Sequence, residues 1–274
     1  MITIDIDPTV FSLGFYELRW YGVMVVLAVL SIIAISWREA KRVGVPEDHI
    51  FSLAVWAIIS GVLFSRLIHI IDQWEYYMQN PSQILNFEGL GVYGAVIGII
   101  LAVVVYCLIR KLSIWQLGDI IAPGALVGMA IGRIGCVING CCYGLPTTLP
   151  WAVIYVNPNS YAPLGVPIHP TQVYHLLWNM AAFGLVWSLR RRLKPTGSLF
   201  LLYLALYATG DLIVRFFREG TPFLFGIQQA QLIGIIILVV TVPTLVIRMW
   251  RAKRRGIAIL KVDEATEPQK NQEE

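Results

Sequence analysis

Residues 120–144 read IIAPGALVGMAIGRIGCVINGCCYG, an apolar stretch that ends in a glycine-rich segment and holds one charged residue, Arg133. After Arg133, the next Asp, Glu, Lys or Arg in the chain is Arg190. A guanidinium near a lipid bilayer is costly unless it is paired, and its planar fork suits a phosphate group. The stretch therefore predicts a membrane helix with a cation near its end. This cation needs an anionic partner from elsewhere in the chain or from a ligand.

The composition of the whole chain extends this membrane interpretation. Hydrophobic residues make up 57% of the 274 residues and charged residues 14%, whereas soluble domains carry roughly 25% charged residues. Apolar stretches of the length that spans a bilayer recur along the sequence. We therefore expect an all-α membrane protein with seven transmembrane helices, at residues 18–37, 51–71, 91–109, 120–138, 172–189, 198–217 and 228–248.

The basic residues are distributed unevenly between the connections that join these stretches. Most of the 21 Lys and Arg residues follow the first, third, fifth and seventh stretches, whereas residues 72–90 and 139–171 contain none. Cytoplasmic loops of membrane proteins carry the excess of Lys and Arg. The pattern predicts an N-terminus outside and a C-terminus in the cytoplasm. The net charge of +4 thus reflects topology, and we expect no nucleic-acid partner.

The chain shows no internal repeat and no soluble domain, so we expect residues 1–261 to form a single polytopic transmembrane domain. Residues 262–274 are polar and acidic without apolar periodicity, which predicts a disordered cytoplasmic tail. The connection at residues 139–171 is rich in Pro, Gly and Asn yet still partly apolar. We expect it to form a short hairpin or to lie on the membrane surface.

Asp211 and Arg215 are four residues apart on one predicted helix, so they share a helix face and can form an ion pair. Several cations in one leaflet indicate a pocket for an anionic headgroup, most simply a lipid phosphate. Each cation can instead extend to the interface as an isolated snorkelling side chain. Five arginines fall at or just beyond the outer ends of the predicted spans: Arg19, Arg66, Arg133, Arg215 and Arg218.

Three cysteines, Cys136, Cys141 and Cys142, lie close together in the sequence on the predicted outer side. They can supply a zinc site with His169, but the spacing C-x4-C-C is not typical of zinc sites and adjacent ligands are geometrically awkward. In an oxidising exterior they can instead form one disulfide and leave one thiol free. We therefore expect no metal at this position.

His169 is also a candidate titratable group by itself, because it lies at a predicted helix start on the same side as Arg133. Tyr21 and Tyr93 are each followed by glycine and can bring a hydroxyl group into a pocket. The alternative for these three side chains is a structural role in a core or at the membrane interface, where aromatic residues are enriched.

These motifs together resemble the prolipoprotein diacylglyceryl transferase family. The resemblance covers most of the chain and rests above all on two runs, Gly132-Arg133-Ile134-Gly135 and His169-Pro170-Thr171-Gln172-Val173-Tyr174. Either run alone is modest evidence for the family, whereas the two together are rather specific for it. The resemblance extends to Arg19-Trp20-Tyr21-Gly22, Asn139-Gly140, Gly144 and Phe216-Phe217-Arg218.

The family transfers a diacylglyceryl group from phosphatidylglycerol to the thiol of a lipobox cysteine and releases glycerol 1-phosphate. The resemblance implies that Arg133 binds the lipid phosphate, that Tyr21 helps to line the site and that Arg218 adds a cation near the headgroup. The catalytic candidates are Arg133, Tyr21, His169 and Arg215. The substrate-binding candidates are Arg133, Asn139, Gly144, Tyr93, Asp211 and Arg218.

The chain departs from the common family pattern around this site. Tyr93 stands where the family often has a histidine proposed as the base, and tyrosine is a poor base because its unperturbed pKa is about 10. We therefore expect His169 or a thiolate at the site to take the proton from the acceptor thiol. The other departures are Cys136 in place of Asn, Cys141 in place of Glu, His175 in place of Glu, and an Asp211–Arg215 pair in reversed order.

The resemblance thus predicts a multi-pass enzyme of the bacterial plasma (inner) membrane, with phosphatidylglycerol, prolipoprotein signal peptides and membrane lipids as partners and no cofactor. Two alternatives are a divergent phospholipid-using transferase with another acceptor and a non-catalytic protein that handles lipids or solutes. Transporters commonly contain repeated halves and interrupted midplane helices. Neither feature is evident in this sequence, which favours a transferase.

Overall fold

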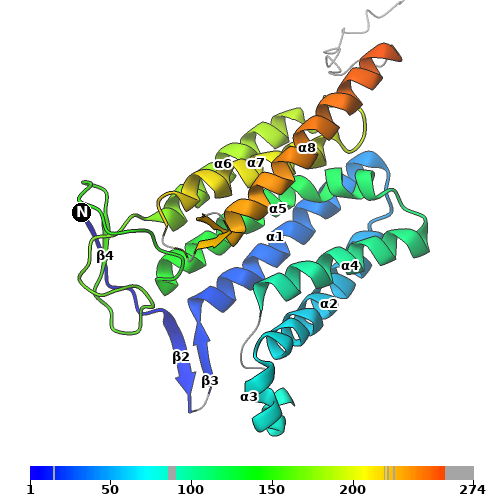
Figure 1. Cartoon of the computed structure of the whole chain (residues 1–274). Coiled ribbons are helices and arrows are strands. Elements are labelled where there is room, and N and C mark those ends of the chain that lie inside the picture. The colour runs from blue at the N-terminus through cyan, green and yellow to red at the C-terminus, as the bar shows by residue number, and fades with distance from the viewer. Residues whose placement is uncertain (15, 86–90, 219, 221, 225, 257–274) are drawn as a thin grey trace, which may run out of the picture. The chain divides into compact units, whose positions relative to one another are not determined.

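The structure, a computed structural model, describes residues 1–14, 16–85, 91–218, 220, 222–224 and 226–256 (Figure 1). The chain divides into two compact units, one of residues 33–120 and one of residues 1–32 with 121–274. Two long helices, α1 (Trp20–Val43) and α5 (Ile114–Asn139), contribute to both units. The expected tail at residues 262–274 lies outside the described residues.

The unit of residues 33–120 is built on two packed helices, α2 (Asp48–Asp72) and α4 (Val92–Arg110), which lie side by side in Figure 1. Along the chain they are separated by a short helix, α3 (Trp74–Gln79), and a 3-10 turn, η1 (Pro81–Leu85). Neither α3 nor η1 was expected from the apolar pattern, since both are too short to produce a spanning stretch.

Small residues set the close spacing of α2 and α4. Gly94 and Gly98 lie about one turn apart on α4, and a Cβ atom on Gly98 would overlap the carbonyl oxygen of Ser60. Where the backbones approach, Ser60 donates a hydrogen bond to the carbonyl of Gly98 at 2.8 Å. Ser65 donates in the same way to the carbonyl of Gly91 at 2.9 Å. Close backbone contact through small residues and hydroxyl hydrogen bonds is how membrane helices associate.

Arg66 of α2 is buried and serves the structure of this unit. Its guanidinium donates hydrogen bonds to the hydroxyl of Tyr77 at 3.0 Å and to the carbonyl oxygens of Gln83 at 2.7 Å and Ile84 at 3.2 Å. A buried cation without such partners would be strongly destabilising. The network therefore ties α3 and η1 to α2, and Arg66 is engaged within its own unit rather than serving as a headgroup cation.

In the other unit, α7 (Ser198–Arg215) packs against both α6 (Thr171–Leu189) and α8 (Gln229–Arg254). At the α6–α7 contact, Trp178 donates a hydrogen bond from its indole nitrogen to the carbonyl of Leu206 at 2.8 Å. A core of four buried side chains joins α5, α6 and α7: Leu126, Ala182, Val186 and Leu199.

Two glycines on α5 bring the first part of α1 close to this helix. Gly128 and Gly135 are seven residues apart and therefore lie on one face of α5. A Cβ atom on Gly128 would lie 2.7 Å from the side chain of Ile32, and one on Gly135 would lie 2.9 Å from Cβ of Met24 and 3.3 Å from Cα of Tyr21. The close contact therefore places Tyr21 beside the last turns of α5.

Small sheets accompany the helices of this unit, and they were not expected from the sequence. Within residues 139–171, antiparallel bridges join Ile168 to Pro146 and to Val153, which is part of the hairpin arrangement that was one expectation. The strand at Val153 pairs mainly with the distant N-terminus, and such long-range pairing leaves no local sequence pattern. The sheets consist of a parallel pair, β1 (Ile2–Ile4) with β4 (Val153–Tyr155), and two antiparallel pairs, β2 (Thr9–Leu13) with β3 (Tyr16–Arg19) and β5 (Pro222–Leu224) with β6 (Ile227–Gln228).

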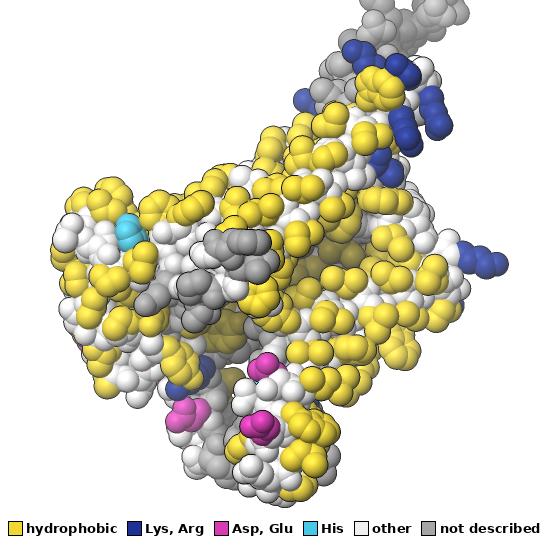
Figure 2. Space-filling model, in the orientation of Figure 1, with side chains coloured by type: hydrophobic (Ala, Val, Ile, Leu, Met, Phe, Trp, Pro, Cys, Tyr) yellow, Lys and Arg dark blue, Asp and Glu magenta, His cyan; other side chains and the backbone are white. Residues whose placement is uncertain are grey.

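Helices form at all seven expected stretches, and the expected helical membrane fold is confirmed. Six of them are long and apolar enough to cross a membrane: α1, α2, α4, α5, α7 and α8. The helix at the remaining stretch, α6, is not among these six and buries the polar residues His175 and Asn179. Along α8, hydrophobic side chains cover the visible surface and Lys and Arg gather at its C-terminal end (Figure 2).

We expect Gly98→Ala to destabilise the α2–α4 pair by about 1–3 kcal/mol, because the new Cβ must displace the backbone of α2 at Ser60. In the control Gly184→Ala, nothing lies within 4 Å of the added Cβ, so stability should be kept or raised by the higher helix propensity of alanine. Thermal unfolding of the purified protein in detergent measures both variants. Equal melting temperatures for Gly98→Ala and the unsubstituted protein would contradict this account of the pair.

Candidate active site at the end of α5

The chain leaves α5 through a glycine turn that fixes its direction. Gly140 adopts a left-handed conformation with φ of 69°, which glycine tolerates at a helix C-terminus. Its backbone N–H donates to the carbonyl of Val137 at 3.3 Å, and that of Cys141 donates to the carbonyl of Cys136 at 3.2 Å. These two bonds form a Schellman motif. A side chain on Gly140 would overlap Ser160, so the turn requires glycine.

Two buried residues at the start of α6 hold the segment that follows this turn. Thr171 donates a hydrogen bond from its hydroxyl to the carbonyl of Cys142 at 2.7 Å, and the Gln172 side chain donates to the carbonyl of Cys141 at 2.8 Å. Cys142 has φ of 61°, a left-handed conformation that is uncommon for a residue with a side chain. The hydrogen bonds from α6 therefore help to maintain a strained backbone at Cys142.

Gly144 lies where three segments meet. A Cβ atom there would lie 2.5 Å from the carbonyl oxygen of Phe217, 2.6 Å from Cβ of His169 and 2.8 Å from Cγ2 of Thr171. Its backbone N–H donates to the carbonyl of His169 at 3.0 Å. Gly144 therefore allows the segment after α5, the start of α6 and the end of α7 to pack closely, which a larger residue would prevent.

His169 is half-buried in an aromatic cluster just before α6. Its Nδ1 lies 3.2 Å from the hydroxyl of Tyr174, and its ring centroid lies 5.2 Å from that of Phe217. Its backbone N–H donates to the carbonyl of Leu145 at 3.0 Å. The ring therefore has a fixed orientation, with a hydroxyl partner available for its Nδ1 atom.

Asp211 of α7 lies between a histidine and an arginine. Nε of Arg215 donates to its Oδ2 at 3.3 Å, so the ion pair expected from the i, i+4 spacing is confirmed. Its Oδ1 lies 3.7 Å from Nε2 of His175, which is buried and makes no hydrogen bond among the described residues. His175 was not among the site residues predicted from the sequence, although it lies one helical turn from Thr171 and Gln172 and therefore on the same face of α6.

Three arginines lie within electrostatic range of this buried histidine. Arg133 of α5, Arg215 of α7 and Arg218 just beyond α7 all lie close enough to His175 to interact with it electrostatically. Arg133 also interacts in this way with Tyr21. The structure thus brings together most of the candidates that lie far apart in the sequence.

Two of these arginines have no protein partner in the described part of the chain. Arg215 is paired with Asp211, whereas the guanidinium groups of Arg133 and Arg218 form neither a hydrogen bond nor an ion pair with any described residue. Both lie close enough to Cys142 to act on its charge. An excess of positive charge at one place attracts an anion, and paired guanidinium groups suit phosphate.

The electrostatic environment of Cys142 favours its ionised form. Hydrogen bonds with Cys136 and Cys141, followed by the positive charges of Arg218 and Arg133, lower the pKa of the Cys142 thiol below its usual range. A thiolate, unlike a thiol, is a strong nucleophile and metal ligand.

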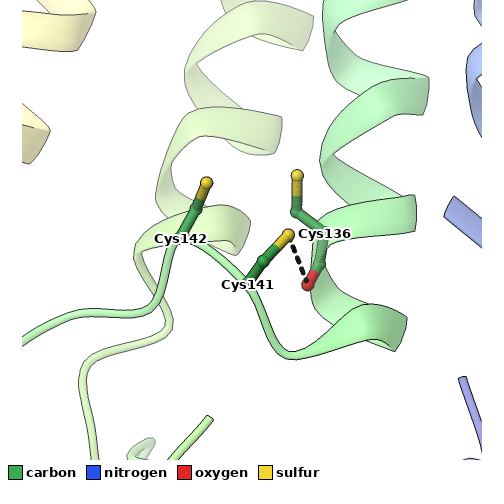
Figure 3. A group of neighbouring side chains, drawn as sticks. All are labelled: Cys136, Cys141 and Cys142. Atoms are coloured by element: carbon green, nitrogen blue, oxygen red, sulfur yellow. Dashed lines mark hydrogen bonds between the residues drawn. The ribbon is translucent and has the colours of Figure 1, made fainter. Parts of the chain in front are cut away.

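The three cysteines form one cluster (Figure 3). Their sulfur atoms all lie within 4.8 Å of one another, and all three thiols are free. Cys136, in the last turns of α5, is buried, whereas Cys141 and Cys142 are half-buried. The three described thiols therefore lie together but form no disulfide, which was one possibility considered from the sequence.

Arg19 and Asn139 are engaged with each other at the edge of the site. Nη1 of Arg19 lies 3.4 Å from Oδ1 of the buried Asn139, and its guanidinium also pairs with Glu17 at 3.6 Å and lies over the ring of Tyr161. These contacts fasten the N-terminal hairpin to the end of α5. Tyr93, another substrate-binding candidate, stands in the first turn of α4 in the unit of residues 33–120, with its side chain exposed.

We expect Thr171→Val to lower the free energy of unfolding by about 1–3 kcal/mol, because it leaves the carbonyl of Cys142 without its buried donor while keeping the side-chain shape. The control Thr209→Val removes a hydroxyl that donates to the carbonyl of Ala205 within α7. This carbonyl also accepts a backbone hydrogen bond of the helix, so it keeps a donor in the variant. The effect of Thr209→Val should be smaller than about 0.5 kcal/mol. Denaturant unfolding compares the two, and equal losses would contradict the role assigned to Thr171.

Comparisons with known proteins show similarity over most of the chain. The family model described as prolipoprotein diacylglyceryl transferase matches residues 8–247. A protein of Dehalococcoides mccartyi strain 195 is 40% identical over 254 residues, which cover 92% of this chain and 98% of the relative. A protein of Bacillus cereus is 35% identical over 263 residues, covering 92% and 96%, and one of Clostridium tetani is 35% identical over 217 residues, covering 78% and 86%.

All three relatives carry the name phosphatidylglycerol–prolipoprotein diacylglyceryl transferase. The matched region contains α1 to α7, most of α8 and every candidate site residue. The match over nearly the whole chain confirms the family expected from the sequence motifs. The chain belongs to the prolipoprotein diacylglyceryl transferase family.

Proposed function

We propose that the chain transfers the diacylglyceryl group of phosphatidylglycerol to the cysteine thiol of prolipoprotein lipoboxes, the first step of bacterial lipoprotein maturation. The names of its relatives state both substrates. One observation carries the proposal. The guanidinium groups of Arg133 and Arg218 lie close to the thiol-rich segment and have no partner among the described protein residues. Such a pair has the charge to receive the phosphate of an anionic lipid.

In the proposed reaction, negative charge develops on the phosphate that Arg133 and Arg218 bind. An acceptor thiolate attacks the glyceryl carbon next to the phosphate, and the carbon–oxygen bond breaks. The bonding electrons then stay on the phosphate of the departing glycerol 1-phosphate, which gains one negative charge. Fixed cations that stabilise charge as it develops lower the barrier of such a step. Arg133 binds the phosphate through its planar fork, and Arg218 adds a second cation.

The remaining candidates act around this phosphate site. Tyr21 lines it from α1, because it lies against the end of α5 and within the electrostatic range of Arg133. Asp211 fixes Arg215 in place, so this arginine contributes charge without being free to move. His169, with its oriented ring, is a candidate to accept the thiol proton.

Three further substrate-binding candidates have supporting rather than chemical roles. Asn139 and Gly144 act by holding the backbone that surrounds the phosphate site, as their contacts with Arg19 and with His169 indicate. Tyr93 lies in the other unit with its side chain exposed, and its part in headgroup binding stays a prediction from the sequence.

The membrane placement follows from charge. Seven helices cross the plasma (inner) membrane, with the N-terminus outside and the C-terminus in the cytoplasm. The basic residues at the C-terminal ends of α1, α4 and α8 support this orientation, because positive charge accumulates on the cytoplasmic side. Acceptor signal peptides then reach the site from the membrane, and the single polytopic domain at residues 1–261 and the tail at residues 262–274 stay predictions from the sequence.

Reconstitution tests the activity directly. The purified chain is placed in vesicles that contain phosphatidylglycerol, a lipobox peptide is added, and the peptide is weighed by mass spectrometry. We expect a mass gain of one diacylglyceryl group on the peptide with cysteine and none on the same peptide with serine. A folded preparation that gives no such gain contradicts the proposal. A gain on another acceptor alone would indicate the divergent transferase.

Arg133→Ala should lower the rate of transfer by about 100-fold or more, since removing one fixed donor to a developing negative charge commonly costs that much. Arg133→Lys should keep part of the activity, because it retains the charge but not the planar fork. The control Arg251→Ala removes an exposed arginine from the last turn of α8 and should transfer at the unsubstituted rate. Normal turnover by Arg133→Ala, with insertion into the membrane intact, would remove Arg133 from the mechanism.

A further inference from the structure

We propose that Cys136, Cys141 and Cys142 bind a zinc ion that leaves one coordination position for the acceptor cysteine thiol. The inference rests on the proposed function, because it assigns the step that makes this thiol nucleophilic. It replaces the expectation from sequence spacing that these cysteines bind no metal.

The distances between the three sulfur atoms suit one metal ion. Zinc binds thiolate sulfur at about 2.3 Å, so two ligands of a tetrahedral site lie about 3.8 Å apart. The sulfur atoms of the cluster already lie within 4.8 Å of one another and are free. Small rotations of the side chains, without movement of the helices, would bring them into coordination geometry.

The backbone conformation allows the adjacent residues Cys141 and Cys142 to bind the same metal ion. Neighbouring side chains in an extended chain point in opposite directions. At Cys142 the left-handed backbone conformation changes this direction, and Figure 3 shows the sulfur atoms of Cys141 and Cys142 gathered on the side of Cys136. The hydrogen bonds from Thr171 and Gln172 hold this strained segment in place. Strain of this kind persists where the surroundings determine it and is typical of functional sites.

One side of the cluster is accessible from outside. Cys136 is buried, whereas Cys141 and Cys142 are half-buried, so the ion would be held from within and reached from outside. Three protein ligands with one open position are the pattern of catalytic rather than structural zinc.

The chemistry is complete without an oxidant or a reductant. The acceptor thiol gives its proton to His169, as in the proposed function, and coordinates the zinc ion as a thiolate. The bound sulfur then forms a bond to the glyceryl carbon of phosphatidylglycerol, and the bond from this carbon to the phosphate oxygen breaks. The electron pair remains on glycerol 1-phosphate, and the resulting thioether, a weaker ligand than a thiolate, leaves the zinc ion.

Zinc content tests the ligands. We expect the full chain, purified from membranes without chelators, to carry close to one zinc per chain by elemental mass spectrometry. Cys136→Ser, Cys141→Ser and Cys142→Ser should each lose most of it, whereas the control Cys107→Ser, at a free cysteine in α4, should retain it. Unsubstituted protein with no more zinc than the three variants would overturn the inference, whether its thiols are free or joined in a disulfide.

Cobalt tests the open position and requires no variant to fold. With Co²⁺ in place of zinc, we expect thiolate-to-cobalt absorption in the unsubstituted protein. A lipobox peptide with cysteine should shift the absorption, and the serine peptide should not. An unchanged spectrum with the cysteine peptide, in a sample shown to bind this peptide, would overturn the open position.

A parallel transfer assay separates this inference from the proposed function. Transfer at the full rate by zinc-free protein would overturn the inference and leave the proposed function intact. Loss of transfer in zinc-free protein, with recovery when zinc alone is returned, would support both. Zinc and peptide thiol bound without any diacylglyceryl product would contradict the proposed function and leave the metal site supported.

Discussion

Two hydrogen bonds between the start of α6 and the segment after α5 hold the candidate site in place. Their donors, Thr171 and Gln172, are almost completely buried, so water does not compete for the two carbonyl groups. Through them, the direction of α6 determines where Cys141 and Cys142 lie. Thr171 also packs against Gly144, so the same contact positions the chain beside His169. The thiol cluster, the aromatic cluster and the arginines depend on this one junction.

Electrostatics then divides the arginines at and beside the candidate site into two kinds. Arg19 and Arg215 have carboxylate partners, Glu17 and Asp211, and act as parts of the scaffold. Arg133 and Arg218 have no described ion-pair partner, although unpaired cations near a bilayer are costly. In the proposed function, an anionic lipid phosphate supplies the missing charge. The interaction between the phosphate and the two guanidinium groups would then both bind the substrate and stabilise the site.

Much of the fold could be predicted from the sequence, because the apolar stretches that form its helices are a local pattern. The helices and the Asp211–Arg215 pair follow from such local periodicity. The pairing of Ile2–Ile4 with Val153–Tyr155 could not be predicted, since partners so distant leave no mutual pattern. The orientation of the adjacent thiols of Cys141 and Cys142 could not be predicted either, because it depends on the left-handed conformation of Cys142.

The central claim is that the end of α5 binds the phosphate of phosphatidylglycerol. An experimental structure of the chain in lipid nanodiscs that contain phosphatidylglycerol tests it most directly, with the phosphate located in the density. We predict that the phosphate oxygens lie within hydrogen-bonding distance of the guanidinium groups of Arg133 and Arg218. A phosphatidylglycerol phosphate bound elsewhere, with these two guanidinium groups paired to protein carboxylates, would contradict the claim.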